Sequence, residues 1–333
     1  MSHAASKQTR TDYIHPDEAC TLYGLFRKRV ERSPADIAYR NYNRAAHAWE
    51  DTTWAEMADM VALWQAAFAQ ENLKPGDRVA IALKNSREWV AFDQAAMGHG
   101  LVVVPLYSDD RADNVAYILR DAAVKILLVE SSRLWRRLGP AVKDVACMQR
   151  ILIFEADSKS EPEDERILPI KDWLAKGQQS SSATSGLIDR PDESDKLASI
   201  VYTSGTSGQS KGVMLSHANM LGIAYASIQS VAVYKDDLFL SFLPLSHTFE
   251  RTVGYYVPIM AGATVAHARS VNQLADDLVT IKPTALISVP RIFERVNGRI
   301  MQQMHKGPFI KRLLFNLTSV SYTHLRAHET KPN

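Results

Sequence analysis

The feature that most constrains the fold is the alternation of short apolar runs with helix-like segments along the first 200 residues. Strand-like apolar runs occur at 78–83, 101–106, 125–129, 151–154 and 197–201. Segments 87–97 and 113–122 lie between such runs and have helical spacing of apolar residues. Because strands that alternate with helices form βαβ units, the pattern predicts an α/β fold with a largely parallel sheet.

A further helix is predicted at 54–68. Thr53 and Glu56 have the spacing of a capping box, which marks a helix start. Apolar residues then recur at helical spacing at Trp54, Met57, Val61, Trp64 and Phe68. We expect this stripe to pack in the core rather than to bind a cofactor.

Composition excludes several classes of protein. The net charge of +2 gives no strongly basic surface, so nucleic acid is not an expected partner. Two cysteines, Cys20 and Cys147, are too few for a disulfide framework or a Cys-rich zinc site, and they fit a reducing compartment.

Membrane segments and secretion signals are not evident either. Residues 1–17 contain no apolar stretch typical of a signal peptide, and no apolar run is long enough to span a bilayer. We therefore predict a cytoplasmic protein. The basic and apolar segment 306–317 fits either peripheral membrane contact or an ordinary docked helix.

The strongest chemical signal is the segment 202–217, YTSGTSGQSKGVMLSH, which follows a strand-like run. It contains hydroxyl side chains, glycines and one lysine, namely Thr203, Ser204, Gly205, Thr206, Ser207, Gly208 and Lys211. Hydroxyls, exposed backbone N–H groups and a cation are the groups that bind a polyphosphate. From composition alone, a polar surface turn remains the alternative.

The spacing excludes two better-known phosphate loops. A Walker A loop needs Gly-Lys followed by Ser or Thr, whereas Lys211 lies between Ser210 and Gly212. A dinucleotide fingerprint follows a strand and opens a helix, whereas Gly98 and Gly100 follow a helix and precede a strand.

Two later blocks accompany this loop. The block 242–251, FLPLSHTFER, contains His247, although a lone histidine in such a position is more often structural. In the block 283–295, PTALISVPRIFER, residues 285–289 are predicted to form a buried strand, and Pro290 is predicted to open a helix.

Together the three blocks resemble those of the AMP-binding, adenylate-forming superfamily, which includes acyl-CoA synthetases, luciferases and peptide-synthetase adenylation domains. The resemblance extends from about residue 22 to about residue 317, and the form of block 242–251 is similar to that of long-chain-fatty-acid–CoA ligases. It implies a large N-terminal α/β domain with layered sheets and helices, incomplete, at 21–318. We expect a polar lead at 1–20 and a non-native tail at 319–333, and no C-terminal mobile domain.

The resemblance also implies a reaction: ATP-dependent activation of a fatty acid to acyl-AMP and then to acyl-CoA, with ATP, Mg²⁺ and CoA. It assigns the ATP phosphates to Thr203, Ser204, Gly205, Thr206, Ser207, Gly208 and Lys211. Lys211 and His247 would be catalytic, and Thr203 would contact Mg²⁺. His247, Gly254, Tyr255 and Tyr256 would line the fatty-acid site, although a buried core turn explains the last three equally well.

Two alternatives stay open. One is a different adenylate-forming ligase, either an aryl-CoA ligase or an acyl-AMP ligase that does not use CoA. The other is a nucleotide-binding fragment with no catalysis of its own. The family's later blocks supply a magnesium-binding Glu, a ribose-binding Asp and a catalytic Lys, and they are not in this sequence. We therefore expect the chain as given to be inactive alone.

Overall fold

The computed structural model describes residues 10–157, 164–179, 186–190, 193–203, 209–294 and 298. The chain divides into two units, 1–287 and 288–333. In the second unit, the described part is a helical turn at 290–294 with its flanking residues and residue 298. The predicted tail at 319–333 and the basic segment 306–317 lie outside the described residues.

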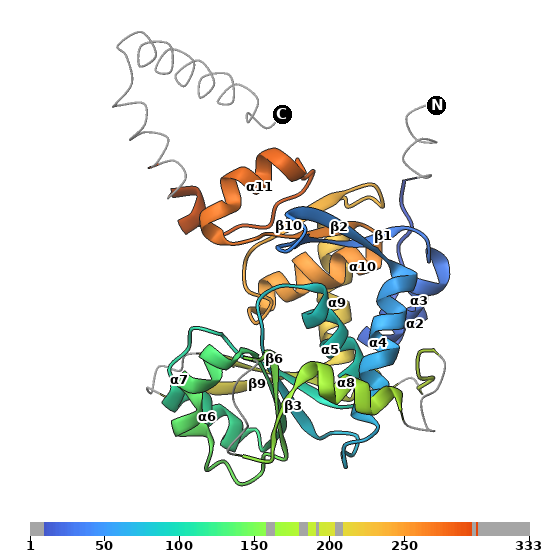
Figure 1. Cartoon of the computed structure of the whole chain (residues 1–333). Coiled ribbons are helices and arrows are strands. Elements are labelled where there is room, and N and C mark those ends of the chain that lie inside the picture. The colour runs from blue at the N-terminus through green and yellow to red at the C-terminus, as the bar shows by residue number, and fades with distance from the viewer. Residues whose placement is uncertain are drawn as a thin grey trace, which may run out of the picture. The chain divides into compact units, whose positions relative to one another are not determined.

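A seven-stranded sheet forms one part of the first unit (Figure 1), with strand order β7-β6-β5-β3-β4-β8-β9. Its strands are β3 (Arg78–Ala82), β4 (Val102–Pro105), β5 (Val124–Ser131), β6 (Arg150–Glu155), β7 (Ile167–Pro169), β8 (Leu197–Thr203) and β9 (Lys211–Ser216). All neighbours pair in parallel except β8 and β9, which form an antiparallel hairpin. The predicted parallel sheet is confirmed.

Helices cover both faces of this sheet. One face packs against α4 (Trp54–Phe68), α5 (Arg87–Gly98) and α8 (Ile170–Gln178), and the other against α6 (Ala112–Asp121) and α7 (Ser132–Val142). On β3, Val79 and Ile81 belong to the first core, whereas Ala80 and Ala82 belong to the second. Because side chains alternate along a strand, a strand buried on both faces is a continuous apolar run.

The predicted start of α4 is confirmed. The Thr53 hydroxyl accepts a hydrogen bond from the Glu56 amide at 3.2 Å, and the Glu56 carboxylate accepts one from the Thr53 amide at 2.7 Å. Both bonds satisfy amide groups that lack partners in the first turn of a helix. Trp54, Met57, Val61, Trp64 and Phe68 are all buried, so the stripe is core packing.

A second sheet has four strands in the order β10-β11-β1-β2. They are β10 (Leu238–Ser241), β11 (Thr264–His267), β1 (Ile37–Asn43) and β2 (Ala48–Thr53). The sequence analysis located none of these strands. The strand predicted at 285–289 is wrong, because Ala285 forms only an isolated bridge with Phe239 and Leu286 is 36% exposed.

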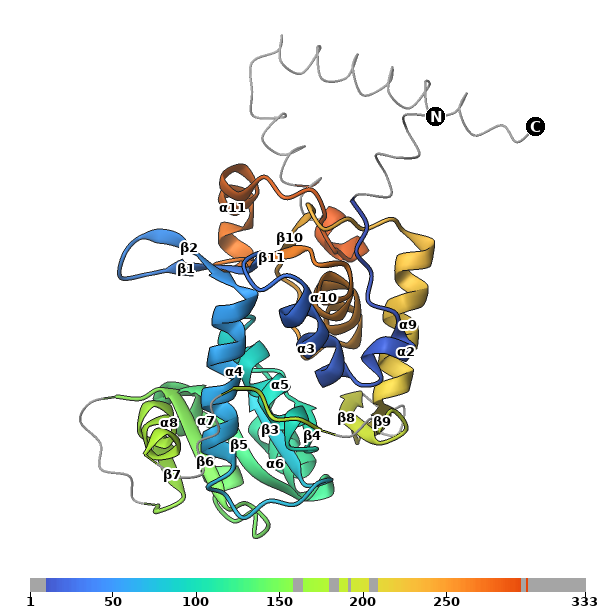
Figure 2. The same ribbon diagram turned by 90° about the vertical axis from the view of Figure 1, so that its right-hand side faces the viewer.

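The remaining elements surround the second sheet. They are α2 (Pro16–Ala19), α3 (Leu22–Arg32), α9 (His217–Ser230), η1 (Glu250–Tyr256), α10 (Val257–Ala261), η2 (Val271–Gln273) and α11 (Leu274–Ile281). Figure 2 shows the β8–β9 hairpin at the start of α9. Among the described residues, no helix is both long and apolar enough to cross a membrane.

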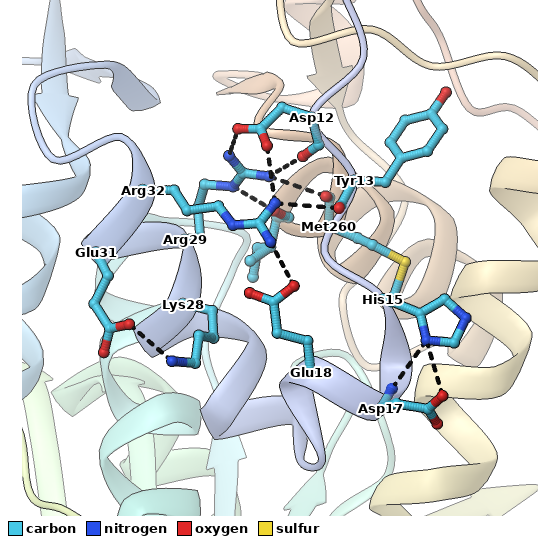
Figure 3. Close-up of polar contacts among 11 residues, drawn as sticks. Asp12, Tyr13, His15, Asp17, Glu18, Lys28, Arg29, Glu31, Arg32 and Met260 are labelled. Carbon is cyan, nitrogen blue, oxygen red and sulfur yellow. Dashed lines mark hydrogen bonds and ion pairs between the residues drawn. The ribbon is translucent and has the colours of Figure 1, made fainter.

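The segment before α3, which the sequence marks as a polar lead, is joined to α3 and α10 through Asp12 and Ile14 (Figure 3). Arg29 is 1% exposed and donates to Asp12 at 2.7 Å and to the carbonyls of Ile259 at 2.9 Å and Met260 at 3.0 Å. The Ile14 amide also donates to the Met260 carbonyl at 3.0 Å. These bonds join the first described residues to α10.

Candidate active site

The predicted phosphate loop is carried by the β8–β9 hairpin. Thr203 ends β8 and Lys211 begins β9, and the two residues are partners in the ladder. Both are exposed. Ser204, Gly205, Thr206, Ser207 and Gly208 lie outside the described residues, so their predicted contacts stay predictions.

On each side of the loop, a hairpin residue is hydrogen-bonded to α6. The Tyr202 hydroxyl donates to the Asp121 carboxylate at 2.5 Å, and the Ser210 hydroxyl donates to the Asn114 side-chain oxygen at 3.0 Å. Burial raises the pKa of Tyr202, and its bond to Asp121 raises it further, so the phenol keeps its proton and remains a donor. The positions at which the loop leaves the sheet are therefore fixed.

His247 lies on a segment held by Asn85, which follows β3. The Asn85 amide nitrogen donates to the Leu243 carbonyl at 2.6 Å, and its oxygen accepts from the Leu245 amide at 3.0 Å. His247 is exposed, and its Nδ1 accepts from the Phe249 amide at 3.2 Å. A neutral His247 ring therefore carries its proton on Nε2 and can donate it to a ligand.

One cavity brings the two predicted regions together. It has a volume of about 620 Å³, and Thr203, Ser210, His247 and Thr248 line it. Thr203 and His247 are 44 residues apart in sequence, and the fold places both on this wall. Lys211, although opposite Thr203 in the hairpin, is not among the residues that line the cavity.

Sequence reasoning missed the acidic wall of this cavity. Tyr107, Asp109 and Asp110 line it, and all three follow the carboxyl end of β4. Ligands bind outside the carboxyl ends of parallel strands, so the polar run after the predicted strand 101–106 was the available signal.

A magnesium ion fits this cavity by the chemistry of its donors. The hydroxyl of Thr203 and the carboxylates of Asp109 and Asp110 supply the oxygen atoms that Mg²⁺ prefers. The described residues contain no group of three or more His, Cys, Asp or Glu side chains placed to hold a metal ion. Mg²⁺ usually has few protein ligands and completes its shell with phosphate oxygens and water.

A second cavity is lined in part by the residues that follow His247 and Thr248. It has a volume of about 740 Å³, and its walls are mainly apolar. Phe249, Val253 and Val257 line it, with residues of α9 and β10. His247 and Thr248 line the first cavity and Phe249 lines the second, so consecutive residues of one segment contribute to both cavities.

Gly254, Tyr255 and Tyr256 lie in η1 and are buried. The hydroxyls of Tyr255 and Tyr256 donate to the Asp93 carboxylate at 3.1 Å and 2.9 Å. A Cβ atom on Gly254 would lie 2.4 Å from the Glu250 carboxylate, which explains a glycine there. These are contacts of a core turn, and none of the three lines either cavity. Their role in an acyl site stays a prediction.

Comparison with known proteins agrees with this architecture. Residues 26–326 match the family described as AMP-binding enzyme. Fatty acyl-CoA synthetase A of Dictyostelium discoideum is 29% identical over 75% of this chain and 38% of its own. Long chain acyl-CoA synthetase 3 of Arabidopsis thaliana is 27% identical over 96% of this chain and 49% of its own. The chain spans about half the length of the curated relatives it matches, or less.

Solved structures share the fold. The N-terminal domain of FACL13 from Mycobacterium tuberculosis is 22% identical, with a TM-score of 0.67 over 82% of this chain and 64% of that one. The adenylation domain of a carboxylate reductase from Mycobacterium chelonae is 19% identical, with a TM-score of 0.73 over 90% of this chain and 51% of that one. The family match extends over most of the sequence and includes both the hairpin and the His247 segment. The chain therefore belongs to the AMP-binding enzyme family.

Proposed function

We propose that this protein takes part in the ATP-dependent activation of a long-chain fatty acid, first to acyl-AMP and then to acyl-CoA. One observation carries the proposal: Thr203 and His247 line a polar cavity, and Phe249, two residues after His247, lines an apolar cavity. A fatty acid needs its carboxylate beside the ATP phosphates and its alkyl chain out of water. A polar and an apolar cavity lined by consecutive residues of one segment meet both needs.

In the first step, a carboxylate oxygen of the fatty acid attacks the α-phosphorus of ATP. The bond from that phosphorus to the bridging oxygen of pyrophosphate breaks, and acyl-AMP and pyrophosphate form. The task of the protein is to position the reactants and offset charge. Thr203, Lys211 and the loop between them would hold the β- and γ-phosphates. Mg²⁺, when bound at Thr203, neutralises phosphate charge.

His247 would act at the carboxylate. Its Nε2–H is free to donate to an acyl oxygen, because its Nδ1 accepts from the Phe249 amide. In the second step, the sulfur of CoA attacks the acyl carbon as its thiol proton leaves, and AMP departs with the electrons of the acyl–oxygen bond. The alkyl chain would lie along Phe249, Val253 and Val257 throughout.

Binding to the purified 333-residue chain tests this proposal. The probes are acyl-adenylate analogues in which a sulfamate replaces the phosphate, with acetyl, benzoyl, octanoyl and hexadecanoyl groups. Burial contributes about 0.8 kcal/mol per CH₂ group, so affinity should rise steeply from acetyl to the longer chains, as measured by calorimetry. Equal affinity for all four analogues, or a preference for benzoyl, would refute the fatty-acid assignment.

A further inference from the structure

Arg251 is fully buried and contacts parts of the chain that carry the candidate site. It is 0% exposed, and its Nη1 donates to the Ser199 hydroxyl at 2.6 Å. Its Nη2 donates to the carboxylate of Asp93, which is also 0% exposed. Its backbone amide donates to the His247 carbonyl at 3.0 Å.

Two of these partners, Ser199 and His247, lead to walls of the polar cavity. Ser199 lies on β8, four residues before Thr203, and its hydroxyl donates to the Val103 carbonyl of β4 at 2.6 Å. Strand β4 leads to Asp109 and Asp110. His247 lies one helical turn before Arg251. A single guanidinium group therefore joins the His247 segment to the strands that end at Thr203 and at the acidic wall.

A buried ion pair such as Arg251 with Asp93 contributes little to stability by itself. Removing two charges from water costs several kcal/mol each, and well-packed apolar residues of similar volume often stabilise a core as much. The Nε of Arg251 is buried without a hydrogen-bond partner among the described residues, which adds to that cost. The network is instead suited to fixing geometry, because a planar guanidinium bonds its partners in set directions.

We propose that Arg251 is a positioning residue that fixes Thr203 and His247 relative to one another, so that the carboxylate reaches the α-phosphate. This proposal rests on the proposed function. The reacting atoms must approach to about 3 Å, and a misplacement of about 1 Å can lower a rate by about 100-fold. Arg251 acts through Ser199 and the His247 segment and does not itself line the cavity.

Arg29 offers a matched control. It too is a buried arginine that pairs with an aspartate, Asp12, and donates to main-chain carbonyls (Figure 3). Its bonds join the N-terminal segment to α10 and do not involve β8 or the His247 segment. Arg29→Lys should therefore lower stability without moving the site.

The experiment compares Arg251→Lys with Arg29→Lys in the 333-residue chain. Lysine keeps the positive charge but cannot bond Ser199 and Asp93 in the fixed directions of a guanidinium. Affinity for the hexadecanoyl adenylate analogue is measured at temperatures that give each variant the same margin below its Tm. We expect at least tenfold weaker binding for Arg251→Lys and less than twofold for Arg29→Lys.

A milder variant covers the case in which Arg251→Lys does not fold. Ser199→Ala removes the bond from Arg251 to β8 but keeps the ion pair with Asp93. It should weaken analogue binding about fivefold. Equal effects of the Arg251 and Arg29 variants at matched stability, or unchanged binding by Ser199→Ala, would overturn the proposal.

Amide hydrogen exchange without ligand separates this inference from the proposed function. In Arg251→Lys, or in Ser199→Ala should the lysine variant not fold, exchange should rise together in 197–203 and 243–250. In Arg29→Lys it should rise only in 10–20 and 257–262. A wild-type chain that does not bind the analogue would contradict the proposed function, yet the exchange pattern would still decide whether Arg251 couples the two segments. Exchange that rises in only one segment would overturn the coupling.

Discussion

Glu250 gives the sharpest test of how the core tolerates a buried charge, because its charge should oppose folding at neutral pH. The side chain is 0% exposed and accepts one hydrogen bond, from the Ser241 hydroxyl at 2.6 Å. Its other carboxylate oxygen is buried without a partner among the described residues. Burial raises the pKa of Glu250 from 4.5 to about 7, and the bond from Ser241 lowers it in part.

The sign of the effect follows from this raised pKa. Between pH 4.5 and about 7, the unfolded chain has lost the Glu250 proton and the folded chain has kept it. The stability that this group contributes is therefore fully present below pH 4.5 and is lost as the pH rises to about 7. Multiplying the difference between 4.5 and about 7 by 1.36 kcal/mol per pH unit gives a loss of about 3 kcal/mol.

Glu250→Gln should remove this dependence, because a glutamine accepts from Ser241 without a charge. Two buried histidines act in the opposite direction: burial lowers the pKa of His217 to about 4 and that of His267 to about 3. Their stability contributions rise with pH up to about 6.5 and are common to both proteins. The difference in unfolding free energy between variant and wild type therefore isolates Glu250.

Urea unfolding followed by tryptophan fluorescence at pH 4.5, 5.5, 6.5 and 7.5 measures that difference. We expect it to increase in favour of Glu250→Gln by about 3 kcal/mol across this range. Glu56→Gln is a control, because hydrogen bonds from Thr53 lower the pKa of Glu56 below its usual 4.5. Its effect on stability therefore varies with pH only below this range, and its difference from wild type should stay nearly constant from pH 4.5 to 7.5. Parallel pH curves for Glu250→Gln and wild type would refute the reasoning.

Three further predictions concern residues of the candidate site. Lys211→Ala should weaken ATP binding about tenfold, since a charge-assisted contact is lost, and leave binding of the sulfamate analogue, which lacks β- and γ-phosphates, within twofold. Titration calorimetry with both ligands decides this, and equal losses would contradict a phosphate role. His247→Ala should weaken binding of the analogue and leave the Tm unchanged, because the His247 side chain is exposed. A lower Tm with normal binding would show that His247 has a structural role. Phe249→Ala should reduce the preference for hexadecanoyl over acetyl analogues, and an unchanged ratio would place the alkyl chain elsewhere.

The seven-stranded sheet could be predicted because its central strands are buried on both faces. Segments such as 78–83 and 125–129 are continuous apolar runs for that reason. The four-stranded sheet could not be predicted in the same way. Strand β1 has only two buried residues, Ala38 and Tyr39, and β10 and β11 have four residues each. Neither length nor alternation distinguishes such strands from loops.

The candidate site was partly predictable. The composition and position of the loop after β8 indicated phosphate binding, and the resemblance selected His247. The buried charges could not be found from the sequence, since Asp93, Glu250 and Arg251 are of residue types that usually lie at the surface. Asp93 and Arg251 pair with each other and Arg251 with Ser199 across more than 50 residues of sequence, and only the tertiary structure brings these groups together.

The segment from His247 to Val257 carries two of the buried charges, Glu250 and Arg251, beside residues that line the cavities. His247 lines the polar cavity, Phe249 and Val253 line the apolar cavity, and Glu250 and Arg251 lie in the core. A π-helix has more residues per turn than an α-helix and often occurs at functional sites. Phe249, Val253 and Val257 lie before, within and after η1, and their spacing of four residues keeps one apolar line along the second cavity. The same backbone therefore orients the proposed carboxylate and alkyl sites, and Arg251 anchors it to β8. Substitutions of residues that face the cavities should change ligand affinity and leave stability nearly unchanged. Substitutions of residues that face the core should change stability, and Arg251→Lys should change ligand affinity as well.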